Sequence, residues 1–209
     1  MEDFNKPFRH SKVARLIDET DSSILSNITT VTLAKLITPT TTTTTAYTLN
    51  FNNAFYNPHS GHNATAGGII ASTGFYISSA TTEYFFDDDG TGNLRIYYLV
   101  AGTRTYYDEK AGTVDYTNGV IKINSILISS VSDVDGSSST RFRLTVIPDS
   151  NDVIPVRNQL LEIDTTNTSI TGSVDATATT GKGYTVSTTG TTTTTSVSTS
   201  STTAKTSSY

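Results

Sequence analysis

The sequence predicts a mainly β protein of antiparallel strands and hairpins, with a short N-terminal helix and a low-complexity C-terminal tail rich in Ser and Thr. Apolar and polar residues alternate over many short segments, and this two-residue period is typical of half-buried strands. The pair Asn118-Gly119 stands between two such segments and suits a two-residue hairpin turn. From Ser173 onward, 23 of 37 residues are Ser or Thr, which leaves too few apolar side chains for a core.

The composition limits the class of protein. The net charge of −5 and the lack of a basic stripe argue against a nucleic-acid partner. The sequence contains no cysteine, so neither a disulfide framework nor a thiolate zinc site can form. No run approaches the roughly 18 apolar residues of a membrane helix, and the N-terminus lacks the apolar stretch of a secretory signal. We therefore expect a protein without a membrane partner that is made inside a cell.

Three parts are expected along the chain. Residues 1–45 form a helical N-terminal segment and linker, residues 46–172 a β-rich domain, and residues 173–209 a tail. The tail is expected to be flexible, or to order as added strands on a partner.

The N-terminal part contains the predicted helix. Val13, Leu16 and Ile17 recur at helical spacing, which predicts a helix within residues 11–26 with Ser11 as its N-cap. Arg15 and Glu19 are four residues apart and are expected to form an ion pair on its solvated face. A strand is expected within residues 27–38, followed by an exposed run of six threonines.

The hairpin of residues 112–123 is the strongest local signal. A two-residue turn at Asn118-Gly119 would place Val114 opposite Ile123 and Asp115 opposite Lys122, the latter as an ion pair. After Ile123 the apolar positions change parity, which predicts a β-bulge near Asn124-Ser125. Further strands are expected at residues 46–55, 69–77, 81–87, 94–100, 104–107, 140–147, 153–164 and 168–174.

No pattern indicates catalysis, a cofactor or a metal. His59 and His62 lie in a turn-rich loop, but a closed zinc site needs four ligands. Residues 87–90 and 133–136 resemble the start of a calcium loop, yet both lack the carboxylate at position twelve, so turns are the better interpretation. No nucleophile has a base and an orienting group nearby in the sequence. We predict a non-enzymatic protein with no cofactor and no metal.

Six segments together resemble a known family. They are KVARLIDETDSSILSN (12–27), LNFNNAFYNPHSGH (49–62), GGIIASTGF (67–75), DDDGTGNLRIYYL (87–99), GTVDYTNGVIKI (112–123) and DVIPVRNQLLEID (152–164). Their order and spacing are similar to the C-terminal part of the baseplate wedge subunit of T4-like contractile-tailed phages, over roughly residues 8–172. The resemblance implies a structural component of the virion tail baseplate, assembled in the host cytoplasm. Its copies would pair through a wedge or dimerisation domain at residues 46–172, contact other wedge proteins and join neighbouring wedges into a ring.

Exposed side chains would then join the copies. Outward tyrosines bury a large area at low entropic cost, which makes them good interface anchors. The predicted interface residues are Tyr97, Tyr107, Val153, Arg157, Asn158 and Leu161, of which the last four lie in an extended edge segment. The alternative is a β-sandwich adhesin or glycan-binding module of a tail fibre, which exposed tyrosines and a Thr-rich stalk would also suit.

Overall fold

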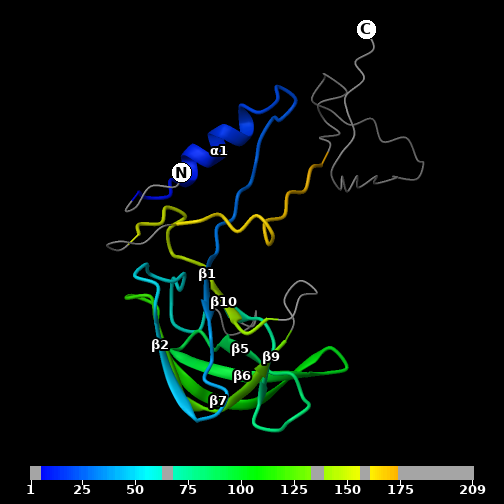
Figure 1. Ribbon diagram of the computed structural model, residues 1–209. Helices are drawn as coiled ribbons and strands as arrows, with labels where there is room; N and C mark the ends of the chain where they lie inside the picture. The colour runs from blue at the N-terminus through cyan, green and yellow to red at the C-terminus, as the bar shows by residue number, and fades with distance from the viewer. Residues whose placement is uncertain (1–5, 63–67, 133–138, 156–160, 174–209) are drawn as a thin grey trace, which may run out of the picture. The chain divides into compact units, whose positions relative to one another are not determined.

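The computed structural model describes residues 6–62, 68–132, 139–155 and 161–173 (Figure 1). The chain forms two compact units, Met1–Leu161 and Glu162–Tyr209. The helix and all the strands described below belong to the first unit, so the candidate site is sought there.

One helix and ten strands make up the regular structure of the described residues. The helix is α1 (His10–Asp18), and the strands are β1 (Leu33–Ile37), β2 (Thr45–Asn50), β3 (Ile70–Ser72), β4 (Phe75–Ile77), β5 (Phe85–Asp88), β6 (Asn93–Val100), β7 (Thr103–Asp115), β8 (Val120–Ile126), β9 (Ile128–Val131) and β10 (Phe142–Val146). They form a five-stranded sheet ordered β2-β8-β7-β6-β5, a three-stranded sheet ordered β1-β10-β3 and a β4-β9 pair. Every pairing is antiparallel, which confirms the predicted fold class.

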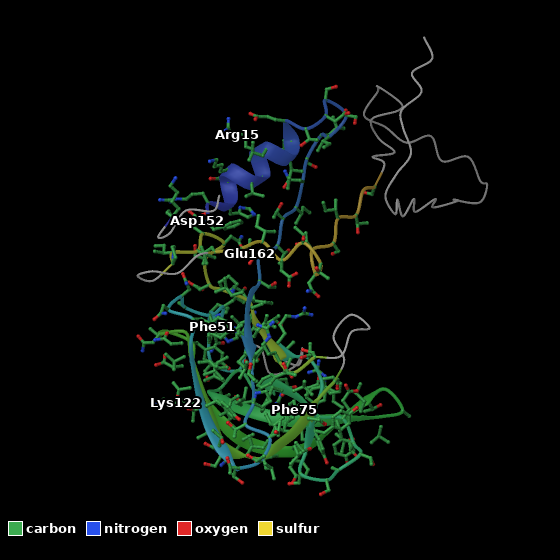
Figure 2. All side chains as sticks on the ribbon, viewed as in Figure 1. Arg15, Phe51, Phe75, Lys122, Asp152 and Glu162 are labelled. Carbon is green, nitrogen blue, oxygen red and sulfur yellow. The ribbon has the colours of Figure 1, made fainter. Side chains whose placement is uncertain are left out.

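One hydrophobic core joins the three sheets. Phe75 of β4 stacks on Phe86 of β5 with ring centroids 4.5 Å apart, and Phe142 of β10 lies 6.0 Å from Phe75. All three rings are fully buried, and Figure 2 shows Phe75 among the strands. The predicted inward positions of β10, Phe142, Leu144 and Val146, are likewise fully buried. Alternation of apolar residues therefore identified this strand correctly.

The β7–β8 hairpin has the predicted faces but not the predicted turn. Val114 lies opposite Ile121 and Asp115 opposite Val120, so four residues rather than two connect the strands. The predicted pairing of Asp115 with Lys122 is therefore wrong. Because the register differs by two residues, an even number, Val114 and Ile121 still face the core.

Side-chain hydrogen bonding explains the wider connection. The Asp115 carboxylate accepts hydrogen bonds from the backbone N (2.9 Å) and the side-chain Nδ2 (2.7 Å) of Asn118. Gly119 alone of this connection has a positive φ, of 65°. Four-residue hairpin loops are commonly built around such locally bonded turns.

A two-residue turn of the expected kind lies instead between β6 and β7. Val100 pairs with Thr103, and the residues between them, Ala101 and Gly102, have φ of 49° and 81°. An alanine at positive φ is strained, because its Cβ approaches the backbone.

Ala101→Asn is expected to stabilise the protein by roughly 0.5–1 kcal/mol, since asparagine tolerates this conformation and favours such turns. Urea denaturation at neutral pH measures the change, with Ala101→Ser as the comparison. An unchanged or lower midpoint for the asparagine variant would contradict the strain at Ala101.

The predicted β-bulge is confirmed. Between the pairs Tyr47–Ile123 and Thr45–Ile126, β8 has one more residue than β2, and that residue falls at Asn124-Ser125. The bulge allows the chain to change parity before β9.

Other element boundaries differ from the prediction. The helix ends at Asp18, and residues 19–26 form turns and irregular structure. Residues 69–77 form two strands in different sheets, because the chain leaves β3 at Thr73-Gly74 and re-enters at β4. Only residues 33–37 of the segment 27–38 pair as a strand, and residues 161–173 form none. The separate strand 104–107 is part of the long β7.

Candidate assembly surfaces

The two tyrosines predicted as anchors lie on opposite faces of the five-stranded sheet. Tyr97 pairs across strands with Tyr106 and stacks on Phe85, with ring centroids 5.5 Å apart. Tyr107 instead lies 5.0 Å from the ring of Tyr84, a core residue, and is 57% exposed. Tyr97 lies opposite Tyr106, so Tyr107, the next residue of β7, faces the other side of the sheet. The structure therefore does not bring Tyr97 and Tyr107 into one surface.

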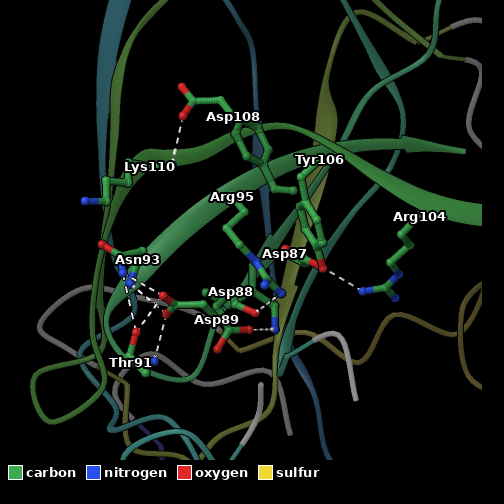
Figure 3. A network of polar contacts seen from close by, with 12 residues as sticks. Asp87, Asp88, Asp89, Thr91, Asn93, Arg95, Arg104, Tyr106, Asp108 and Lys110 are labelled. Carbon is green, nitrogen blue, oxygen red and sulfur yellow. Dashed lines mark hydrogen bonds and ion pairs between the residues drawn. The ribbon is translucent and has the colours of Figure 1, made fainter. Parts of the chain in front are cut away.

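A polar network centred on Asp87 joins β5, β6 and β7 (Figure 3), and Tyr97 contacts it through Arg104. At its centre the Asp87 carboxylate is fully buried. Arg95 Nε donates to its Oδ1 at 2.9 Å, and Arg104 Nη1 and Tyr106 OH donate to its Oδ2 at 2.8 and 3.1 Å. The guanidinium groups also stack on rings, Arg95 over Tyr106 at 4.2 Å and Arg104 over Tyr97 at 4.6 Å.

The Asp87 carboxylate of β5 links this strand to β6 and β7. Burial raises the pKa of Asp87, while Arg95, Tyr106 and Arg104 act to lower it. Every oxygen of the carboxylate is bonded within the chain, so the arrangement holds the sheet together and leaves no free base for chemistry. Sequence reasoning placed Asp87 at the end of a strand and the start of a turn, and missed the network. The signal that could have found it is the alternation of Arg and Tyr on two neighbouring strands.

The next carboxylate, Asp88, is buried on the core side. It accepts hydrogen bonds from the backbone N of Ile69 (2.7 Å) and Ile70 (3.0 Å) and from the Tyr116 hydroxyl (2.6 Å). Burial, followed by the bond to Asp88, raises the pKa of Tyr116 well above its ordinary range. Asp88 thus ties β5 to β3 and to the β7–β8 connection. A Cβ at Gly68 would overlap this carboxylate, which accounts for the glycine there.

Asp89 forms the turn into β6. Its carboxylate accepts bonds from the side chains and backbone N–H groups of Thr91 and Asn93, at 2.5–3.0 Å. Partial burial acts to raise the pKa of Asp89, but these four bonds outweigh it and lower the pKa to about 2. The turn predicted at residues 87–90 is therefore correct from Asp89 onward.

The lowered pKa predicts an acid-dependent contribution to stability. A carboxyl group whose pKa falls on folding stabilises the native state above its unfolded value, here 3.8, and loses that effect as pH falls towards about 2. The difference in unfolding free energy between the wild type and Asp89→Ala should therefore shrink as the pH is lowered through this window. Chemical denaturation at about pH 5 and about pH 2 measures it. A pH-independent difference would contradict the assignment.

The predicted edge segment pairs at Val153 with the N-terminal segment of its own chain. Val153 is buried and exchanges two backbone hydrogen bonds with Phe8, at 2.9 and 3.1 Å. Arg157 and Asn158 lie outside the described residues, and Leu161 is half-buried. Val153 is therefore buried within its own chain.

Asp152, beside Val153, caps α1. Its carboxylate accepts a bond from His10 N at 2.9 Å and contacts Arg9 Nη1 at 3.2 Å (Figure 2). The predicted N-cap, Ser11, is wrong, because the helix already begins at His10. Arg9 occupies the cap position, and its own side chain forms no capping hydrogen bond. A carboxylate at this end satisfies a free N–H group and complements the helix dipole.

Helix α1 buries none of its own residues. Val13 and Ile17 are half-buried, and Leu16 is 44% exposed. The predicted ion pair is confirmed, with Arg15 Nη1 3.2 Å from Glu19 Oε1. An apolar stripe that remains open in the single chain is typical of a helix that packs against a partner.

Comparison with known families concerns this same segment. Residues 1–36 match the family model of the baseplate structural protein gp6, C-terminal domain III. This confirms the family resemblance over the N-terminal segment, which contains α1 and most of β1. The match indicates a structural role in the virion tail baseplate, among other baseplate proteins, and argues against an enzyme. A search of the curated proteins gave no match.

The remaining candidates add no chemistry to this baseplate role. His62 Nδ1 lies 3.1 Å from His59 Nε2. Within the described ranges, no group of three or more His, Asp or Glu residues could hold a metal ion. The loop at residues 133–136 falls outside those ranges. The one described helix is too short to span a membrane.

Proposed function

We propose that this chain is a structural subunit of the baseplate wedge of a T4-like contractile-tailed phage. It pairs with a second copy of itself and contacts other wedge proteins, and repeated pairs join the wedges into a ring. It performs no catalysis and assembles in the host cytoplasm. The observation that supports this most directly is that the segment matching the baseplate family, residues 1–36, also contains a helix with no buried residue.

Sedimentation velocity over a wide concentration range tests the pairing. The chain should pass from monomer to dimer as its concentration rises, because a pair built on an exposed helix buries little area and is weak. A strictly monomeric chain at every concentration would contradict the proposal. Electron microscopy of the virion provides the second test, with density for this fold expected at the baseplate and nowhere else.

A pocket beside Tyr107 favours the alternative function, glycan binding. Its volume is about 290 Å³, and its lining includes the exposed Tyr107 together with Asp108, Asn124 and Ser125. An aromatic ring with neighbouring carboxylate and amide groups can stack on a sugar and bind its hydroxyls. A glycan array with the wild type and Tyr107→Ala separates the functions. Binding lost in the variant supports a receptor-binding module, whereas a wedge subunit should bind no glycan.

A further inference from the structure

One flank of α1 is occupied by the chain's own extended segment. Asn27 Nδ2 donates to the Ala14 carbonyl at 3.1 Å and to Asp18 Oδ1 at 2.6 Å. His10 Nε2 lies 3.0 Å from the Thr29 carbonyl oxygen. His10, Ala14 and Asp18 follow each other at four-residue steps, so they mark one side of the helix. The apolar stripe beside them is left accessible from the other side.

The open flank contains one charge at each end. Lys12 and Glu19 are both exposed and lie seven residues apart, close to two full helical turns, so they share nearly the same angular position. The apolar stripe that contains Val13 and Leu16 runs beside this line. The open side therefore has Lys12 at the start of the helix and Glu19 at its end, where Arg15 of the same helix also contacts Glu19 at 3.2 Å, and the apolar Leu16 lies between the two ends.

This order of charges opposes the helix's own dipole. A helix favours acidic groups in its first turn and basic groups in its last. The first turn of α1 contains no acidic residue, and Asp18 and Glu19 come at its C-terminal end, where Arg15 is the only basic residue of the last turn. The charges of Lys12 and Glu19 are therefore poorly placed for an isolated helix and well placed for a second helix that runs in the opposite direction.

We propose that α1 packs antiparallel against α1 of a second copy of this chain, around a two-fold axis near Leu16. This rests on the proposed pairing and names its surface. In an antiparallel pair related by a two-fold axis, each flank faces the same flank of the partner. Lys12 then lies opposite Glu19 of the other copy, twice. The Leu16 side chains meet at the axis, and Val13 packs near Ile17 across the pair.

Charge reversal tests this arrangement. In Lys12→Glu, two pairs of like charges would face each other, and the same holds for Glu19→Lys. Each single variant should raise the dimer dissociation constant at least about tenfold in sedimentation velocity at low salt. An equimolar mixture of the two variants should recover a dimer, now a heterodimer with two opposite-charge pairs. Glu109→Lys and Lys110→Glu, which change exposed charges on β7, serve as controls and should leave association unchanged.

The outcomes separate this inference from the proposed function. Failure of the wild type to dimerise would contradict both. A wild-type dimer that survives Leu16→Glu with its helix intact by circular dichroism would overturn the α1 interface and leave pairing through another surface. Single variants that dissociate, without recovery in the mixture, would overturn the antiparallel arrangement. Loss in both single variants with recovery in the mixture supports it.

Discussion

Replacement of Asp87 with alanine is expected to lower the free energy of unfolding by about 3–5 kcal/mol. The variant removes the carboxylate that Arg95 Nε and Arg104 Nη1 share, at 2.9 and 2.8 Å. The Arg95 side chain is only 13% exposed, so its charge would remain in a poorly solvated site without this carboxylate. Arg104, at 40% exposure, can turn towards water and should contribute less. Urea denaturation at pH 7, followed by circular dichroism, measures the loss.

A matched control is Glu109→Ala, which removes an exposed carboxylate from β7 and should change stability by less than about 0.5 kcal/mol. If Asp87→Ala costs no more than this control, the network does not hold the sheet. A further variant with Asp87, Arg95 and Arg104 all replaced by apolar residues of similar size should recover much of the lost stability. Buried ion pairs replaced as a whole are often nearly neutral, because no unpaired charge is left behind.

This network marks the limit of sequence reasoning for the fold. The side chains that satisfy Asp87 come from positions 8, 17 and 19 residues further along the chain. They converge only because of the particular register of β5, β6 and β7. Local alternation predicts which residues of one strand share a face, but it does not fix the register between strands. For this reason the sequence alone places Asp87 where a strand meets a turn and does not reveal its partners, and the turn in fact begins at Asp89.

Where the signal is local, the prediction is correct. The alternation in β10 identifies its buried positions, and the parity change after Ile123 identifies the bulge in β8. For the predicted interface residues, alternation within one strand does not show which tyrosines of two strands share a face. The two-residue turn sets a regular register in which Tyr97 lies opposite Tyr106. Tyr107, the next residue, therefore lies on the other face of the sheet. The helical spacing of its apolar residues reveals α1 in the sequence. Only the structure shows that the apolar side of α1 is open.

The Gly119 position predicts the second large loss of stability. Gly119 has φ of 65°, and its backbone oxygen accepts a hydrogen bond from Phe51 N at 2.8 Å. A Cβ there would overlap the backbone oxygen of Asn53, which no change of rotamer can move away. Gly119→Ala should therefore cost roughly 2–5 kcal/mol, from left-handed strain together with displacement of the segment after β2.

Gly102 provides a control with the same backbone strain and no overlap. Its φ is 81°, and nothing lies within 4 Å of the position that an alanine methyl group would take, so Gly102→Ala should cost only about 1–2 kcal/mol. The difference between the two variants isolates the contact of the β7–β8 connection with Asn53. Equal losses on urea denaturation would mean that strain alone explains both glycines. A larger loss at Gly119 would show that this connection anchors β2, the edge strand of the five-stranded sheet, because β8 is the one described strand with which β2 pairs.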